Sequence, residues 1–142
     1  MKQPIMLKVR DKEFRISFVS NFFSVNYYEM KQEMVKAQQA YYDMCAVQEK
    51  LKENKVSVDE ATAVIENTKT TIQSIGKREF FERRMDLVKE ACEINDIEYD
   101  RRFWERRTSP EDLVTFLDAV YIYGIRSAEE PHGEEKSKKA SR

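Results

Sequence analysis

The chain has 142 residues, of which 36% are charged and 41% hydrophobic, with 25 basic and 26 acidic side chains. Three Gly and three Pro are too few for a barrel or sandwich of many short strands, and no Gly-rich loop is present to bind phosphate. The near-zero net charge gives no general attraction to nucleic acid or to an anionic membrane. This composition favours one mostly helical domain.

Apolar and polar residues alternate in two short runs, which predicts a β-hairpin over about residues 4–19. A two-residue turn at Asp11 and Lys12 would place Val9 opposite Phe14 and continue that register toward both strand ends. A hairpin alone is marginally stable in water, so we expect helices to cover it. The six inward side chains would be Ile5, Leu7, Val9, Phe14, Ile16 and Phe18.

A long helix is predicted from about Ser24 to Leu51, because apolar residues there recur in steps of three and four. Its apolar stripe is wider than a two-stranded coiled-coil seam. The seam consists of Tyr27, Met30, Met34, Ala37, Tyr41, Met44, Gln48 and Leu51, flanked by Tyr28, Val35, Tyr42 and Cys45.

Further helices follow, each with a start or stop signal. Ser57 and Glu60 form a capping box for a second helix, and Gly76 marks its end or a kink before a third. Asp100 can cap a short helix, and Ser109-Pro110 begins the last helix, which Gly124 can terminate. We therefore predict a mainly α (α+β) fold, in which an N-terminal hairpin precedes a bundle of about four helices.

We expect a single domain over residues 1–125, followed by a disordered charged tail over 126–142, because the tail lacks large apolar residues. No apolar run is long enough for a membrane span, and the N-terminus lacks the core of a signal peptide. These features predict a cytoplasmic protein.

No pattern points to catalysis, a cofactor or a metal. Cys45 and Cys92 both lie in helical patterns, where we expect buried, unreactive thiols. The sole histidine, His132, lies in the predicted tail, and no spacing of Cys, His and carboxylates matches a metal site. We expect a protein that is not an enzyme.

The segment R-R-F-W-E-R-R places four arginines around Phe103 and Trp104, a pattern able to clamp phosphates and stack bases. However, the stretch 77–107 holds as many acidic as basic residues. We therefore favour solvated salt bridges with both aromatic rings packed inward, and keep a small nucleic-acid-associated regulator as an alternative.

The remaining signal is the abundance of Tyr and Met on the first long helix, which suits a core and also an adaptable partner surface. Part of this stripe exceeds what the hairpin and shorter helices need to cover. The candidate partner-binding residues are Tyr27, Met30, Met34, Tyr41, Met44, Phe103 and Trp104.

The layout between Phe14 and Leu117 resembles the tail assembly chaperones of long-tailed phages and prophages of Gram-positive bacteria. The similar features are the segment F-V-S-N-F-F-S-V-N-Y-Y-E-M-K-Q-E-M, a helix with an L-V-x-x-x-C pattern, a polar turn, spaced aromatics and a capped last helix. In this chain the matching positions are Leu87, Val88, Cys92, Asn95, Asp96, Tyr99, Asp100, Phe103 and the Ser109–Leu113 start.

The resemblance implies a non-enzymatic chaperone in the host cytoplasm. Such proteins coat the aggregation-prone tape measure protein and help to recruit tail tube subunits around it. The resemblance also allows a homo-oligomer, and a self-associating helical adaptor remains a further alternative.

Overall fold

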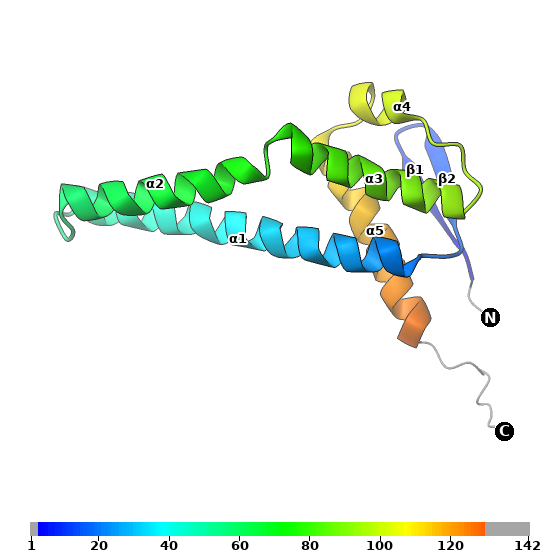
Figure 1. Cartoon of the computed structure of the whole chain (residues 1–142), viewed down its shortest axis with the longest axis horizontal. Helices are drawn as coiled ribbons and strands as arrows, with labels where there is room; N and C mark the ends of the chain where they lie inside the picture. The colour runs from blue at the N-terminus through cyan, green and yellow to red at the C-terminus, as the bar shows by residue number, and fades with distance from the viewer. Residues whose placement is uncertain (1–2, 130–142) are drawn as a thin grey trace. The chain divides into compact units, whose positions relative to one another are not determined.

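The computed structural model describes residues 3–129 of the chain. Its elements, in chain order, are β1 (Ile5–Val9), β2 (Lys12–Ile16), α1 (Asn21–Lys52), α2 (Val58–Ser74), α3 (Arg78–Ile94), α4 (Arg101–Arg106) and α5 (Pro110–Glu129) (Figure 1). The predicted fold class is confirmed: a β-hairpin precedes a long first helix, three further long helices and the short α4.

The chain divides into two compact units, with the boundaries inside α1 and α3. We call residues 1–27 with 85–142 the terminal unit, described over 3–27 and 85–129, and residues 28–84 the middle unit. The single domain expected over 1–125 stays a prediction.

The hairpin forms, but the predicted register is wrong by two residues. Leu7 pairs with Phe14 and Ile5 with Ile16, so the two-residue turn lies at Arg10 and Asp11 rather than one position later. Arg10 adopts a φ of 56°, and its Nε donates to Asp112 at 2.8 Å, which holds the turn in place. A shift of two preserves the inward face, because side chains alternate with a period of two.

Asn95 explains why the second strand ends before Phe18. Its Oδ1 accepts hydrogen bonds from the backbone N–H groups of Ser17 at 2.8 Å and Phe18 at 3.0 Å. Its Nδ2 donates to the carbonyl oxygens of Phe18 at 2.9 Å and Ala91 at 2.8 Å. The amides that would extend the strand are therefore bound to the C-terminal end of α3, and the Phe18 side chain is exposed.

The helix boundaries follow local capping. The hydroxyl of Ser20 accepts the Phe23 N–H, so α1 begins three residues earlier than the predicted Ser24. The predicted capping box at Ser57 and the Asp100 cap of α4 are both confirmed.

The predicted stop of the last helix at Gly124 is wrong, because α5 continues to Glu129. Gly124 has no positive φ, and a Cβ on it would lie 3.0 Å from the Cβ and Cγ1 of Val19. This glycine therefore permits close packing rather than a left-handed cap. Residues 126–129, predicted as tail, are helical, and the rest of the predicted tail lies outside the described residues.

The terminal unit has a dense aromatic core. Phe14 of β2 packs against Trp104 and Phe116 at ring-centroid distances of 5.6 and 5.0 Å, and those two rings lie 4.9 Å apart. Buried aliphatic side chains from α3 and α5 surround them: Leu87, Val88, Leu113, Leu117 and Val120.

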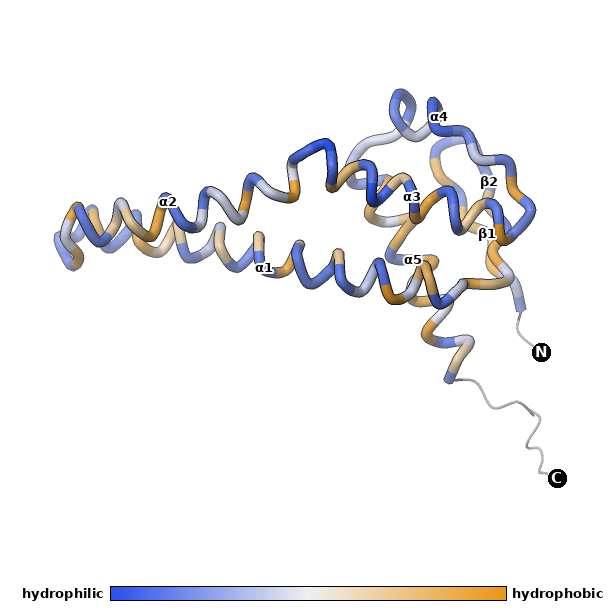
Figure 2. Tube along the Cα trace, viewed as in Figure 1, coloured by the Kyte–Doolittle hydropathy of each residue, from blue (hydrophilic) through white to orange (hydrophobic). Residues whose placement is uncertain are grey.

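The middle unit is packed much more thinly. In it α1 from Tyr28 onward and α2 run antiparallel, connected by a turn in which Asn54 adopts a φ of 58° (Figure 1). Hydrophobic residues recur at intervals along both helices rather than in continuous runs (Figure 2). The buried apolar side chains of this unit are Met30, Ala37, Ala40, Ala61 and Phe80.

Alanine dominates that set, so α1 and α2 bury little apolar area between them. Larger apolar side chains of the same two helices and of the α2 C-cap are only half-buried, namely Met34, Met44, Val64, Ile65, Ile72 and Ile75. Among the helices of the described residues, none combines the length and the hydropathy needed to span a bilayer.

Candidate functional site

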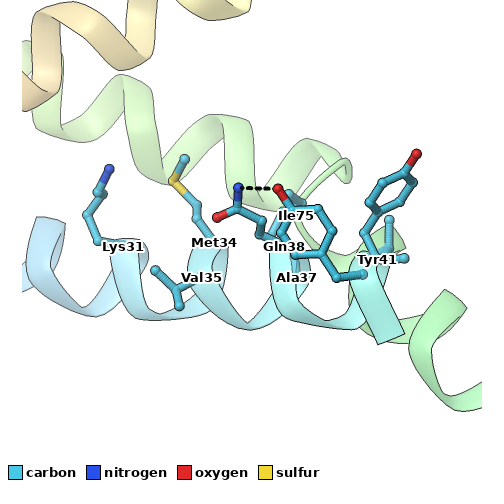
Figure 3. Close-up of a pocket in the computed structure, with 9 residues that line it drawn as sticks. Lys31, Met34, Val35, Ala37, Gln38, Tyr41 and Ile75 are labelled. Atoms are coloured by element: carbon cyan, nitrogen blue, oxygen red, sulfur yellow. Dashed lines mark hydrogen bonds between the residues drawn. The ribbon is translucent and has the colours of Figure 1, made fainter. Parts of the chain in front are cut away.

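An open apolar groove of about 480 Å³ lies between α1 and α2 of the middle unit. We call it the α1–α2 groove. Figure 3 shows Lys31, Met34, Gln38 and Tyr41 in a row along α1, with Ile75, the C-cap residue of α2, beside them. The groove is lined by Lys31, Met34, Val35, Ala37, Gln38, Tyr41, Tyr42, Ile72 and Ile75.

Helical periodicity places these side chains on one side of α1. Positions 31, 34, 38, 41 and 42 succeed one another in steps of three, four or one, so they share a face. Ala37, which is 3% exposed, forms the floor, because its small side chain lets α2 approach closely. Val35, Tyr41 and Tyr42 are 54%, 51% and 56% exposed and form the rim.

Polar contacts fix the rim without filling the groove. The Gln38 Nε2 donates to the Tyr42 hydroxyl at 3.4 Å, as drawn in Figure 3. A hydrogen bond with the Cys45 side chain raises the pKa of Tyr41, so this phenol is neutral at physiological pH. Of the described residues that line the groove, Lys31 is the one with a charged side chain.

An ion pair in the same unit joins α1 to α3. The Arg83 guanidinium donates to both carboxylate oxygens of Glu33, at 3.0 and 2.6 Å. This bidentate contact lowers the pKa of Glu33 and raises that of Arg83. The Arg84 guanidinium lies 4.7 Å from the centroid of the Phe80 ring and donates to the Met34 Sδ at 3.5 Å.

The predicted partner-binding residues fall into three environments. Met34 and Tyr41 line the groove, and Met44 is half-buried on the same helix outside it. Tyr27 and Met30 are each 1% exposed and belong to the core. A side chain this deeply buried offers almost no surface to a partner.

Seven of the nine groove residues are absent from the predicted candidate set, namely Lys31, Val35, Ala37, Gln38, Tyr42, Ile72 and Ile75. Val35 and Tyr42 belong to the predicted flank of the apolar stripe, whereas Ile72 and Ile75 lie at the C-terminal end of α2. The signal that could have found them is the weak seam of α2, whose polar Thr68 leaves its isoleucines without enough apolar partners.

The aromatic pair of the R-R-F-W-E-R-R segment packs inward, as favoured from the sequence. Phe103 and Trp104 are each 3% exposed, so neither ring is available to stack on a base. The Arg101 Nε contacts Glu105 at 2.7 Å, and Arg107 contacts Asp11 at 3.5 Å. The segment therefore combines a core contribution with surface ion pairs.

The two cysteines differ in environment. Cys92 is fully buried, and this burial raises its pKa to about 12. The expectation of a buried thiol at position 45 is wrong, because Cys45 is exposed on α1. Within residues 3–129, no three His, Cys, Asp or Glu side chains gather closely enough to hold a metal ion.

Comparison of the chain with protein-family models, curated proteins and solved structures gives no match.

Proposed function

We propose that this chain is a phage tail assembly chaperone that binds the tape measure protein through the α1–α2 groove and helps to recruit tail tube subunits. The observation that carries the proposal is the apolar groove on a thinly packed pair of helices. The sequence resemblance is the reason for proposing the tape measure protein as the client. The groove is the reason for proposing where that client binds.

The groove suits an apolar helix as its occupant. Amphipathic helices bind partner grooves by inserting side chains at positions i, i+3, i+4 and i+7. A volume of about 480 Å³ accommodates several such side chains. The tape measure protein of long-tailed phages is a long helical protein, which presents repeated faces of this kind.

The chemistry of the lining favours tolerance of sequence variation. The Met34 side chain is flexible and polarisable, and Tyr41 and Tyr42 combine an apolar ring with a polar tip. Full burial of one Val or Ile side chain stabilises an association by about 1.5–3 kcal/mol. Several half-exposed side chains therefore provide affinity for many apolar helices without a unique fit.

The charged side chains elsewhere on α1 and α2 suit a chaperone that keeps its client in solution. Apart from the groove, the exposed positions of α2 are mostly polar or charged. A complex coated by such surfaces resists aggregation. We place the activity in the host bacterial cytoplasm, where phage tails assemble, and assign the protein no catalytic role.

Co-expression with the tape measure protein of the same phage or prophage tests the proposal. We expect the soluble fraction of the tape measure protein to rise several-fold when this chain is present. Unchanged solubility contradicts the proposal, as does a gene neighbourhood that lacks a very long tape measure gene.

A further inference from the structure

Two adjacent columns of exposed residues run along α1 with heptad spacing. In the first, Tyr28, Val35 and Tyr42 are 53%, 54% and 56% exposed. In the second, Glu29, Lys36 and Asp43 directly follow the three members of the first column, and Lys50 continues the same spacing after Glu49, so that the sign alternates along the column. Residues seven apart lie on nearly the same side of a helix, so both columns form continuous strips.

The charged column is available to a partner. All four of its side chains are exposed, and none forms an ion pair within 4.0 Å among the described residues. Glu29 and Lys36 have only longer-range electrostatic interactions, with Arg83 and Glu33 respectively. Asp43 accepts a hydrogen bond from Gln39 Nε2 at 3.0 Å, a contact that leaves its charge uncompensated. Charges that flank an apolar heptad column set partner choice and orientation in paired helices.

We propose that a second copy of this chain pairs with the first through this face of α1, with the two helices antiparallel. Glu29 then lies opposite Lys50 of the second copy, and Lys36 lies opposite Asp43. The two-fold axis repeats both pairs, so four opposite-charge contacts flank Val35 and Tyr42 near the centre of the overlap.

The alternating order of the charges selects the antiparallel orientation. In a parallel pair of helices, the charged column would face the residues on the other flank of the seam, which places Lys36 next to Lys31 of the second copy. That arrangement contains a like-charge contact and none of opposite sign along these columns. In the antiparallel register, each of the four charged residues of the column lies opposite a residue of opposite charge in the second copy.

One consequence rests on the proposed function. Val35 and Tyr42 belong both to this face and to the rim of the α1–α2 groove. Self-association through α1 would therefore cover part of the groove, so that dimerisation and client binding compete. In the absence of a client helix, the dimer would keep the apolar rim of the groove covered.

Sedimentation velocity on the full chain tests the pairing without any client. At about 0.1 mM protein, a dimer of micromolar Kd is largely formed. We expect Lys36→Glu to raise the dimer Kd at least about tenfold, because it replaces two attractive contacts by repulsive ones. Asp43→Lys should do the same, and the double variant Lys36→Glu/Asp43→Lys should restore the wild-type Kd.

Lys89→Glu on α3 is the matched control and should leave the Kd unchanged, and circular dichroism verifies that each variant keeps its helix content. A monomeric wild-type chain at this concentration overturns the proposal. So does a dimer that is insensitive to Lys36→Glu, or one that the double variant fails to restore. None of these readouts depends on a tape measure protein, so their failure is distinct from failure of the proposed function.

Discussion

Cys45 and Cys92 are chemically identical but lie in opposite surroundings. Cys92 is enclosed by the terminal unit, where burial raises its pKa to about 12. The thiolate is the form that attacks a disulfide reagent, so a buried thiol with a raised pKa is inert at neutral pH. Cys45 is exposed on α1.

We therefore expect one fast-reacting thiol in the native protein when a chromogenic disulfide reagent is added at neutral pH. Cys45→Ser should abolish the fast phase, and Cys92→Ser should leave it unchanged. Denaturation should make both thiols react. Two fast-reacting thiols in the native wild-type protein would contradict the burial of Cys92.

The half-buried Asn95 side chain forms hydrogen bonds with several backbone groups. It binds the amides of Ser17 and Phe18 and the carbonyl oxygens of Phe18 and Ala91, and thereby fastens the end of the hairpin to α3. We expect Asn95→Ala to lower the free energy of unfolding by about 2 kcal/mol, since several net hydrogen bonds are lost at once.

Urea denaturation measures this loss, with Glu93→Ala as the control on the same exposed helix end. The control should stay within about 0.5 kcal/mol of wild type. Equal stability of the Asn95 variant and wild type would show that the hairpin is held by its apolar face alone.

At the scale of the elements, the start of α5 contains a reciprocal cap. The Ser109 hydroxyl accepts the Asp112 N–H at 3.1 Å, and the Asp112 carboxylate accepts the Ser109 N–H at 2.9 Å. The hydrogen bond from the Ser109 backbone N–H, together with Arg10, lowers the pKa of Asp112 from its usual 3.8. The ionised carboxylate of Asp112 is therefore stabilised more in the folded chain than in the unfolded chain.

A carboxyl with a lowered folded-state pKa binds fewer protons in the folded than in the unfolded chain. Its contribution to stability is therefore present above about pH 4 and is lost as the pH falls through the folded-state pKa. We expect Asp112→Asn to be less stable than wild type at neutral pH, with a difference that shrinks as the medium is acidified below that range. A difference that stays constant on acidification, measured by urea denaturation, would exclude this role of the Asp112 charge.

The order and type of the elements were predictable from the sequence, because each has a local signal. The capping serine at position 57 and the proline at 110 mark two helix starts, and the period changes from two to three-and-four between hairpin and α1. The hairpin register was not predictable, since it depends on Asn95 and Asp112, which are distant in sequence.

Gly124 illustrates the same limit. A glycine near the end of an apolar pattern is typical of a helix stop, but here Val19 determines its role through close contact. The groove was half predictable: Met34 and Tyr41 follow from the seam of α1, whereas Ile72 and Ile75 join them only through the pairing of α1 with α2.

At the scale of the whole molecule, the two units differ in what their apolar residues do. The terminal unit buries its aromatic rings, whereas the middle unit keeps Val35, Tyr41 and Tyr42 more than half exposed. A helix pair with an alanine-rich interface gains little from its own packing. We therefore interpret its exposed apolar surface as a binding surface whose occupants are supplied by other chains.

Lys36→Glu separates the two occupants that we propose for this surface. It should weaken the dimer while leaving the groove residues intact, so a client should bind this variant at least as tightly as it binds wild type. Weaker client binding by the monomeric variant would mean that the client needs the dimer.

The most direct test of the central claim compares two tyrosines on the same helix. Tyr41 lines the groove and Tyr28 lies outside it, and they are 51% and 53% exposed. Truncation of a binding hot-spot residue, a class rich in tyrosine, costs about 2 kcal/mol or more, which is more than a tenfold loss in affinity. The measurement is the soluble fraction of co-expressed tape measure protein with wild type, Tyr41→Ala and Tyr28→Ala. We predict that Tyr41→Ala loses most of the wild-type effect, while Tyr28→Ala retains or exceeds it, because Tyr28 belongs to the competing dimer face and not to the groove; an equal loss in the two variants would contradict the assignment of the groove as the client site.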